Sequence, residues 1–116
     1  MTLGELIPDV RKLVNDTVPE YRWLDADIAG YLRDSLVRLQ SVRPTTKLEA
    51  SGDGGYDDIA YPPDLTIYAL PPTYLRWRQA FIYYAAARCL EIDAADTVNQ
   101  SLAVDFMAKA EARFVS

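Results

Sequence analysis

Residues 44–72 hold five of the seven prolines and three of the five glycines of this 116-residue chain. Proline lacks an amide proton and its ring clashes with the preceding helical turn, so no long helix can cross this stretch. On both sides of it, apolar residues recur every three or four positions, which is typical of helices. The pattern predicts two helical halves joined by an irregular loop, or by a short β-hairpin built from residues 47–50 and 65–70.

The first predicted helix begins at Thr2 and Glu5, whose spacing is that of a capping box, and runs to Val14. Arg11 and Lys12 lie off its apolar stripe, on the face expected to meet solvent. The helix therefore has one face for the core and one for water. The stripe consists of Leu3, Leu6, Ile7, Val10, Leu13 and Val14.

A break at residues 15–19 separates this helix from the next, and Trp23 is expected to fold back against the helices. Asp25 is predicted to cap a second helix that ends at the step Arg43–Pro44. Its stripe is broad enough to bury most of one side. The stripe comprises Ile28, Tyr31, Leu32, Ser35, Leu36, Leu39 and Val42.

Pro71 and Pro72 suit the first turn of a third helix over residues 73–92, which contains neither glycine nor proline. Its alanines 85–87 would let a neighbouring helix approach closely, so this helix is expected to be central. Residues 93–96 offer a break before a fourth helix that runs to the C-terminus. The apolar positions expected to face the core are Leu75, Phe81, Ile82, Ala85, Ala86, Cys89 and Leu90, then Val98, Leu102, Ala103, Phe106, Met107, Ala110 and Phe114.

These elements predict a mainly α, four-helix bundle-like fold in which residues 1–116 form one domain and 44–72 form a loop insertion. Catalytic equipment is sparse. The chain has no histidine, and its single cysteine, Cys89, lies within an apolar helix where a packing role is favoured over nucleophilic chemistry. Residues 51–55 lack the lysine and helix of a phosphate-binding loop, and Asp53, Asp57 and Asp58 lack the order of an EF-hand. We therefore predict no enzyme activity, no cofactor and no metal.

The net charge of -5 and the isoelectric point near 4.6 argue against a broad nucleic-acid surface, which requires clustered Lys and Arg. No membrane segment and no signal-peptide pattern are found, so the chain is expected to remain inside the cell. Acidic residues alternate with the arginines of the second and third helices, which predicts salt-bridged helix faces. Ion pairs across subunits are the sharper alternative, because Arg is favoured at interfaces.

The order of elements resembles the head-to-tail adaptor (connector) proteins of tailed phages. The resemblance covers most of the chain and rests on the capped helix and Asn15–Asp16–Thr17, on Tyr21–Arg22–Trp23, on Leu24–Asp25–Ala26–Asp27–Ile28, on Arg38–Leu39–Gln40–Ser41–Val42–Arg43–Pro44, on Leu70–Pro71–Pro72–Thr73–Tyr74, and on Asp93–Ala94–Ala95–Asp96 before the last helix.

Membership of that family would imply a structural virion protein of the neck, assembled in the host cytoplasm as a homo-oligomeric, dodecameric ring beneath the portal protein. The helices would contact neighbouring subunits, residues 106–116 would dock on the portal, and a tail or stopper protein would bind next. DNA would pass through the lumen without specific binding, and no membrane would be involved. The same composition permits an alternative, a small helical regulatory or partner-binding module.

Candidate contact residues for the portal and for neighbouring subunits come from three sources. The implied docking segment supplies four, the arginines of the second helix two, and the tyrosines of the irregular segment three, for which local packing is an equal alternative. The set is Phe106, Lys109, Arg113 and Phe114, with Arg33 and Arg38, and with Tyr56, Tyr61 and Tyr68.

Overall fold

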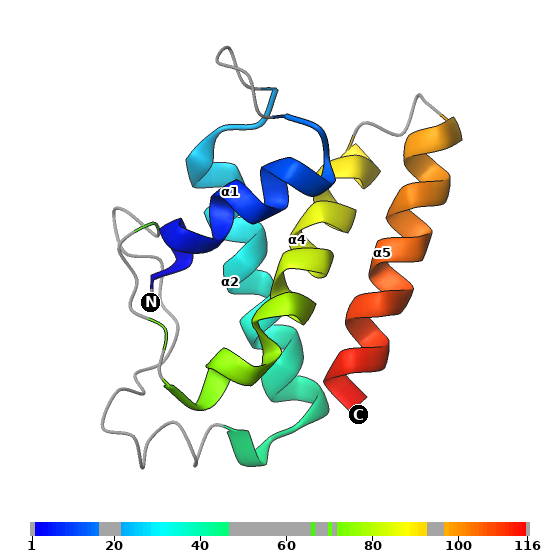
Figure 1. The fold of residues 1–116 in the computed structure, drawn as a ribbon. Coiled ribbons are helices and arrows are strands. Elements are labelled where there is room, and N and C mark those ends of the chain that lie inside the picture. The colour runs from blue at the N-terminus through cyan, green and yellow to red at the C-terminus, as the bar shows by residue number, and fades with distance from the viewer. Residues whose placement is uncertain are drawn as a thin grey trace.

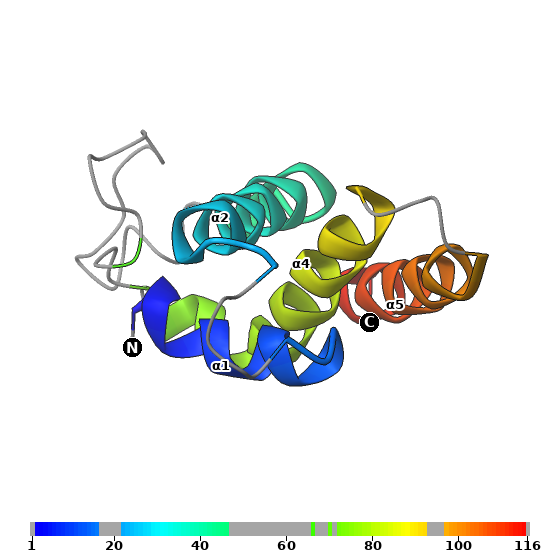
Figure 2. The ribbon, with the colours of Figure 1, turned by 90° about the horizontal axis from the view of Figure 1, so that it is seen from above.

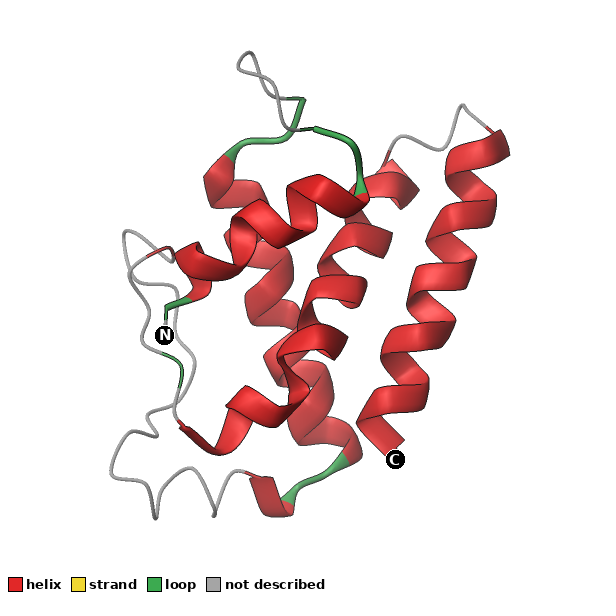
Figure 3. Cartoon of the chain, in the orientation of Figure 1, coloured by secondary structure: helices red, strands yellow, loops and turns green. Residues whose placement is uncertain are grey.

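The computed structural model describes residues 2–16, 22–46, 66, 70, 72–92 and 97–115. Within these ranges the chain is mainly helical and contains no strand, which confirms the predicted bundle-like fold. The proposed hairpin lies outside the described residues, apart from single positions at 66 and 70. The elements are α1 (Leu3–Leu13), α2 (Asp25–Val42), the 3-10 helix η2 (Pro72–Trp77), α4 (Arg78–Ile92) and α5 (Thr97–Val115) (Figures 1 and 3).

Helix α4 is the centre of the molecule, as its sequence predicts. It packs against α1, α2 and α5, and its contact with α5 is the most extensive between any two elements. Seen from above, α1 and α2 lie on one side of α4 and α5 lies on the other (Figure 2). Helix α5 meets α2 only weakly, so it is held almost entirely by α4.

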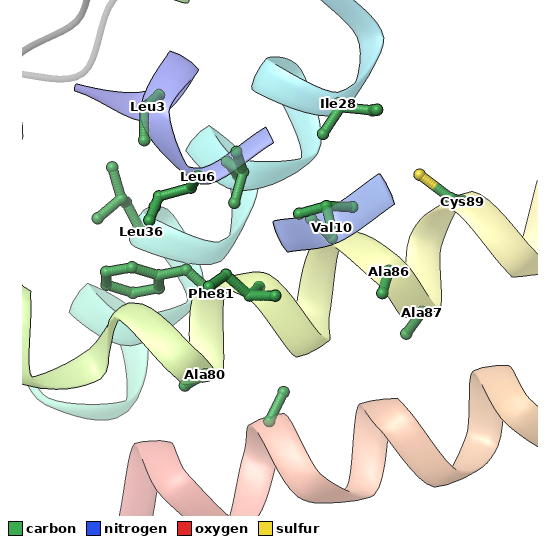
Figure 4. Packing of buried hydrophobic residues seen from close by; sticks show 14 of the residues in the cluster. Leu3, Leu6, Val10, Ile28, Leu36, Ala80, Phe81, Ala86, Ala87 and Cys89 are labelled. Atoms are coloured by element: carbon green, nitrogen blue, oxygen red, sulfur yellow. The ribbon is translucent and has the colours of Figure 1, made fainter. Parts of the chain in front are cut away.

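Small side chains let α4 and α5 approach closely. Ala80 and Ala87 are fully buried on the side of α4 that faces α5, one helical repeat of seven residues apart (Figure 4). Ala103 and Ala110 are buried on α5. On its other side α4 turns larger residues toward α1 and α2, where Phe81 packs near Leu6 and Leu36 (Figure 4). We call Ala80, Ala87, Ala103 and Ala110 the alanine seam.

Helix α1 begins where predicted, but its capping differs. Thr2 is the N-cap residue, yet its side chain makes no capping hydrogen bond, and only the backbone amide of Glu5 bonds to the Thr2 carbonyl, at 3.2 Å. The predicted capping box is therefore wrong, because the Thr2 side chain does not bond to the helix amides. At the other end, Asn15 adopts a positive φ of 57°. Its amide donates to the Lys12 carbonyl and that of Asp16 to the Arg11 carbonyl, which is a Schellman motif.

The Schellman motif positions Asp16 beside Arg11, and this corrects the prediction that Arg11 faces solvent. Arg11 is only 6% exposed. Its guanidinium donates to Asp16 at 2.8 Å and also to Asp25. Asp16 in turn accepts from the amides of Arg22, at 3.0 Å, and Trp23, at 3.3 Å. This cluster ties the end of α1 to the start of α2, because one buried cation meets two carboxylates from different segments.

Helix α2 begins one residue earlier than the predicted capping would require, so the prediction of Asp25 as the N-cap is wrong. Leu24 is the N-cap residue and Asp25 is the first helical residue, so its carboxylate serves Arg11 instead of the helix amides. Trp23 is buried, as expected. The helix ends at Val42, directly before the predicted Arg43–Pro44 stop.

The predicted third helix divides into two parts. Residues 73–77 belong to the six-residue 3-10 helix η2, which starts at Pro72, and the α-helix begins only at Arg78. A 3-10 helix has three residues per turn, so Tyr74 and Trp77 share its buried side. Leu75 is exposed, which contradicts its predicted core position. Leu102 of α5 is exposed too, because Ala103 and not Leu102 is in phase with the buried stripe.

One close approach requires a glycine. A Cβ added to Gly4 would lie 2.7 Å from the backbone oxygen of Thr66, which no real side chain tolerates. The first turn of α1 is therefore in direct contact with residue 66. A pocket of about 470 Å³ opens beside this contact and is lined by Gly4, Ile7, Pro8, Arg11, Lys12, Asp25 and Thr66.

Candidate functional site

Two of the predicted contact residues belong to the core instead of the surface. Phe114 has 0% of its surface exposed and packs against Phe81 and Tyr84, with ring centroids 6.2 and 6.4 Å away. Phe106 is 8% exposed and stacks on Tyr83 at 5.8 Å. Phe114 therefore offers no contact surface, because it anchors α5 on α4.

Lys109 and Arg113 are exposed and share one aromatic partner. The Lys109 ammonium lies 5.7 Å from the ring centroid of Tyr83, and the Arg113 guanidinium lies 5.2 Å from it. These are cation–π distances. Lys109 also lies 5.7 Å from the centroid of Phe106. The two predicted cations thus stand over a continuous aromatic base supplied by α4 and α5.

A second cation–π group continues this surface toward η2. The Arg76 guanidinium lies 3.9 Å from the indole centroid of Trp77, and that of Arg43 lies 5.8 Å from it. Arg43 also donates to the carbonyl of Phe114 at 2.6 Å, which fixes the end of α2 to the end of α5. A pocket of about 220 Å³ connects the two groups, and its lining is Arg76, Trp77, Gln79 and Arg113.

We call Arg76, Trp77, Tyr83, Lys109 and Arg113 the cationic strip. It runs from the end of η2 and the first half of α4 onto the last half of α5, which meet because α4 and α5 run in opposite directions (Figure 1). Residues four apart lie on the same face of a helix, so Lys109 and Arg113 reach the same neighbour. The sequence marks these two as contact residues, places Arg76 only among the arginines of salt-bridged helix faces, and gives no signal for Trp77, because the strip depends on how two helices pack.

Basic groups outnumber carboxylates along the strip. Lys109 pairs with Asp105 at 3.0 Å across one turn of exposed helix. Among the described residues, the lining of the 220 Å³ pocket includes the guanidinium groups of Arg76 and Arg113 and no carboxylate. In a chain with a net charge of -5 this is a local positive surface that composition does not reveal.

The arginines of α2 form ion pairs within the chain. Arg38 makes a two-point contact with Glu111 of α5, at 2.9 and 3.1 Å. That hydrogen bond and the charge of Glu111 raise the pKa of Arg38. Arg33 lies 3.4 Å from Asp34. The predicted interpretation of these residues as parts of salt-bridged helix faces is confirmed for both pairs.

A shallow second pocket of about 390 Å³ lies beside these pairs, lined by Arg33, Asp34, Val37, Arg38, Ser41 and Tyr84. Burial raises the pKa of Tyr84, so its hydroxyl stays neutral.

Helix α5 also exposes an apolar row on the side that α4 does not cover. Val104 is 71% exposed and Val115 is 65% exposed. Ala108 and Ala112 lie between them on the same face and are exposed as well. We call these four residues the outer row.

The other candidates lie outside the described residues or in the core. Tyr56, Tyr61 and Tyr68 lie outside the described residues. Cys89 is fully buried, and burial raises the pKa of its thiol to about 12, which leaves the unreactive protonated form. Among the described residues, no group of three Cys, Asp or Glu side chains is arranged to hold a metal ion.

Comparisons with known proteins identify no relative from which a function could be inferred. No protein-family model, curated protein or solved structure gives a significant match to the chain. None of the helices in the described part of the chain has the length and hydropathy needed to cross a membrane.

Proposed function

We propose that this protein is a structural head-to-tail adaptor of a tailed phage. Copies of the chain form a ring beneath the portal protein, join it to a tail or stopper protein, and leave a lumen for DNA. The proposal combines the resemblance in the order of elements with the surfaces of the helical bundle.

The observation that carries the proposal is the position of α5. This helix of 19 residues packs mainly on α4, meets α2 weakly, and carries part of the cationic strip and the outer row on its other sides. Aromatic residues and Arg are enriched at protein interfaces. A helix at the edge of a bundle with two such surfaces suits a subunit that binds more than one neighbour.

The charge of the chain supports passage of DNA without retention. Affinity for duplex DNA grows with the number of phosphates that Lys and Arg neutralise. A net charge of -5 keeps that number small over most of the molecule. A lumen lined mainly by acidic or neutral side chains would let DNA slide past.

The test is assembly on a portal ring. The purified chain is mixed with the portal protein encoded nearest its gene, and the mixture is examined by light scattering and by electron microscopy. We expect a closed ring of copies on one end of the portal. A chain that stays monomeric or dimeric and does not bind the portal would contradict the proposal and favour a regulatory module.

A matched pair of variants connects this assembly to α5. Val104→Asp places a charge in the outer row and should abolish the ring while leaving the thermal transition of the monomer unchanged. Leu24→Asp is the control, since Leu24 is 67% exposed but lies at the start of α2, away from α5. Equal loss of assembly in both variants would argue against α5 as the contact helix.

A further inference from the structure

A groove of about 510 Å³ lies between α1 and α4. The two helices pack against each other but are not parallel, so they diverge beside their contact and leave space between them (Figure 1). The volume falls in the range of about 300–1,000 Å³ that ligand sites commonly have. We call this space the α1–α4 groove. Its lining includes Asp9, Lys12 and Leu13 of α1 and Arg78, Gln79 and Ile82 of α4.

The inner wall of the α1–α4 groove is apolar. Leu6 and Ile82 line it, and only 1% and 4% of their surfaces are exposed, so both belong to the core. Leu13, the last residue of α1, is half-buried and lines the groove as well. An apolar side chain that covers this wall removes area from water and gains free energy in proportion to that area. The groove therefore favours an occupant with apolar side chains.

Basic side chains stand on both sides of the groove. Lys12 of α1 and Arg78 of α4 are exposed. Within the described part of the chain neither of them belongs to an ion pair, whereas Arg11 and Arg38 each have a carboxylate partner. Ammonium and guanidinium groups bind carboxylates through charge-assisted hydrogen bonds, and Arg can do so at two points. The outer edge of the groove is thus suited to acidic side chains.

Asp9 and Gln79 make the groove more suitable for a peptide than for a nucleic acid. The Gln79 amide can donate to a peptide carbonyl, and both side chains can accept from a peptide N–H group. The Asp9 carboxylate repels phosphates, and the net charge of -5 disfavours a polyanion with one charge on every nucleotide. Carboxylates spaced along a peptide can approach the two cations without crowding Asp9.

We propose that the α1–α4 groove binds a segment of a protein partner in which Asp or Glu side chains alternate with large apolar side chains. The carboxylates meet Lys12 and Arg78, and the apolar side chains cover Leu6, Leu13 and Ile82. This contact goes beyond the proposed ring, because it assigns a partner to α1 and the start of α4 and not to the outer side of α5. Salt weakens the electrostatic part of the binding and leaves the apolar part.

The first experiment measures the fluorescence anisotropy of three labelled probes with the full chain at low salt. One probe is a short peptide of alternating Glu and Leu, the second has Ser in place of Leu, and the third is a DNA duplex. We expect saturable binding of the Glu–Leu peptide, and binding weaker by about tenfold or more for the Glu–Ser peptide, which lacks the apolar area. A Glu–Leu peptide that does not bind, or DNA that binds as tightly, would overturn the proposal.

Charge reversal then tests the two cations. Lys12→Glu with Arg78→Glu should weaken binding of the Glu–Leu peptide by about tenfold or more, since attraction becomes repulsion. Lys12→Arg with Arg78→Lys keeps both charges and should retain most of the affinity. The matched control is Arg22→Glu with Lys109→Glu, which makes the same change in net charge at exposed positions that do not line the groove. Equal loss in the control would show that net charge, and not the groove, attracts the peptide.

Leu13 tests the apolar wall separately. Leu13→Asn should weaken binding of the Glu–Leu peptide and leave that of the Glu–Ser peptide unchanged, because only the first peptide covers the wall. Leu102→Asn, at an exposed leucine of α5, is the control and should change neither. Equal weakening of both peptides by Leu13→Asn would contradict the apolar half of the proposal.

The mass of the chain alone distinguishes a separate partner from a second copy. We expect light scattering to give the same mass for the unchanged chain and for Lys12→Glu with Arg78→Glu. A lower mass for the variant would mean that another copy fills the groove, and would overturn the proposal. None of these measurements involves the portal, so their failure leaves the adaptor role to its own test. Circular dichroism and the thermal transition of each variant confirm folding, since Lys12 and Arg78 are exposed.

Discussion

The start of α2 and the whole of α5 are attached to the bundle in opposite ways. The start of α2 is fixed by Arg11, a buried cation that meets two carboxylates from different segments. Helix α5 is fixed by the alanine seam and by Phe114, and its charged residues lie outside. In the first region charge is part of the internal structure, whereas in the second the ion pairs lie at the surface. The difference predicts that charge substitutions cost more stability at Arg11 than on the outer side of α5.

Among the variants that test this comparison, removal of Phe114, the aromatic anchor of α5, should have the largest effect on the free energy of unfolding. Phe114→Ala leaves a cavity beside Phe81 and Tyr84, and should lower the free energy of unfolding by about 3–5 kcal/mol in urea denaturation. The control is Val115→Ala at the adjacent exposed position, which should change it by less than about 0.5 kcal/mol. Similar small effects in both would mean that Phe114 is a contact residue after all.

Loss of the buried cation should be nearly as damaging on the other side of α4. Arg11→Met keeps most of the side-chain volume but leaves Asp16, which is only 10% exposed, without its counter-charge. We expect a loss of about 3 kcal/mol in the same denaturation experiment. Lys12→Met, at the exposed neighbouring position, is the control and should be close to neutral. Equal stability of the two variants would show that the Arg11 cluster does not hold the helices together.

Enlarging the alanine seam should separate α5 from α4 without altering α1 or α2. Ala87→Leu forces extra volume into a fully buried contact and should cost about 1–3 kcal/mol. Amide hydrogen exchange should show the loss of protection mainly in α5. Ala108→Leu makes the same change on the exposed side of α5 and should leave protection unchanged. A uniform loss across all helices would mean that α5 does not respond as a separate unit.

The exposed ion pair between α2 and α5 should contribute least. A double-mutant cycle with Arg38→Ala and Glu111→Ala should give a coupling of about 0.2–1 kcal/mol, because both side chains are partly hydrated. The coupling should fall further in high salt. A coupling as large as the loss expected for Arg11 would remove the contrast between the two regions.

Most of the fold could be predicted from local patterns in the sequence. The apolar period and the Arg43–Pro44 step located α2 to its last residue, and the alanines identified α4 as central. Trp23 and Cys89 are buried as expected. These features could be predicted because they follow from residues that lie close together in the sequence.

The errors share a different cause. The sequence predicts a solvent-exposed Arg11 because its two carboxylate partners come from a turn and from the next helix, which the apolar period of α1 does not reveal. Leu75 was placed in the core because the sequence does not distinguish a 3-10 start from an α-helical one. Phe114 was assigned to a contact surface by resemblance, although its apolar spacing also placed it in the core stripe. To avoid each of these errors, one would need to know how the helices pack against each other.

The candidate site was only half predictable for the same reason. Lys109 and Arg113 stand four residues apart on one helix, a spacing that sequence analysis can use. Arg76 joins them only through the antiparallel packing of α4 and α5, across a long interval of sequence. The net charge of the whole chain also conceals this positive surface, because the acidic residues of 44–65 outweigh its Lys and Arg side chains in the total.

The contact between Gly4 and Thr66 has a consequence for how this protein can vary in evolution. Thr46 is buried at the end of α2, and Thr66 rests on α1, so both ends of residues 47–65 are fixed to the bundle. The entropic cost of closing a loop between two fixed ends grows slowly with its length, by about 0.6 kcal/mol for each doubling. Insertions and deletions here would leave the helices unchanged. Related chains are expected to differ most in the length of this interval, while keeping a glycine at the position of Gly4.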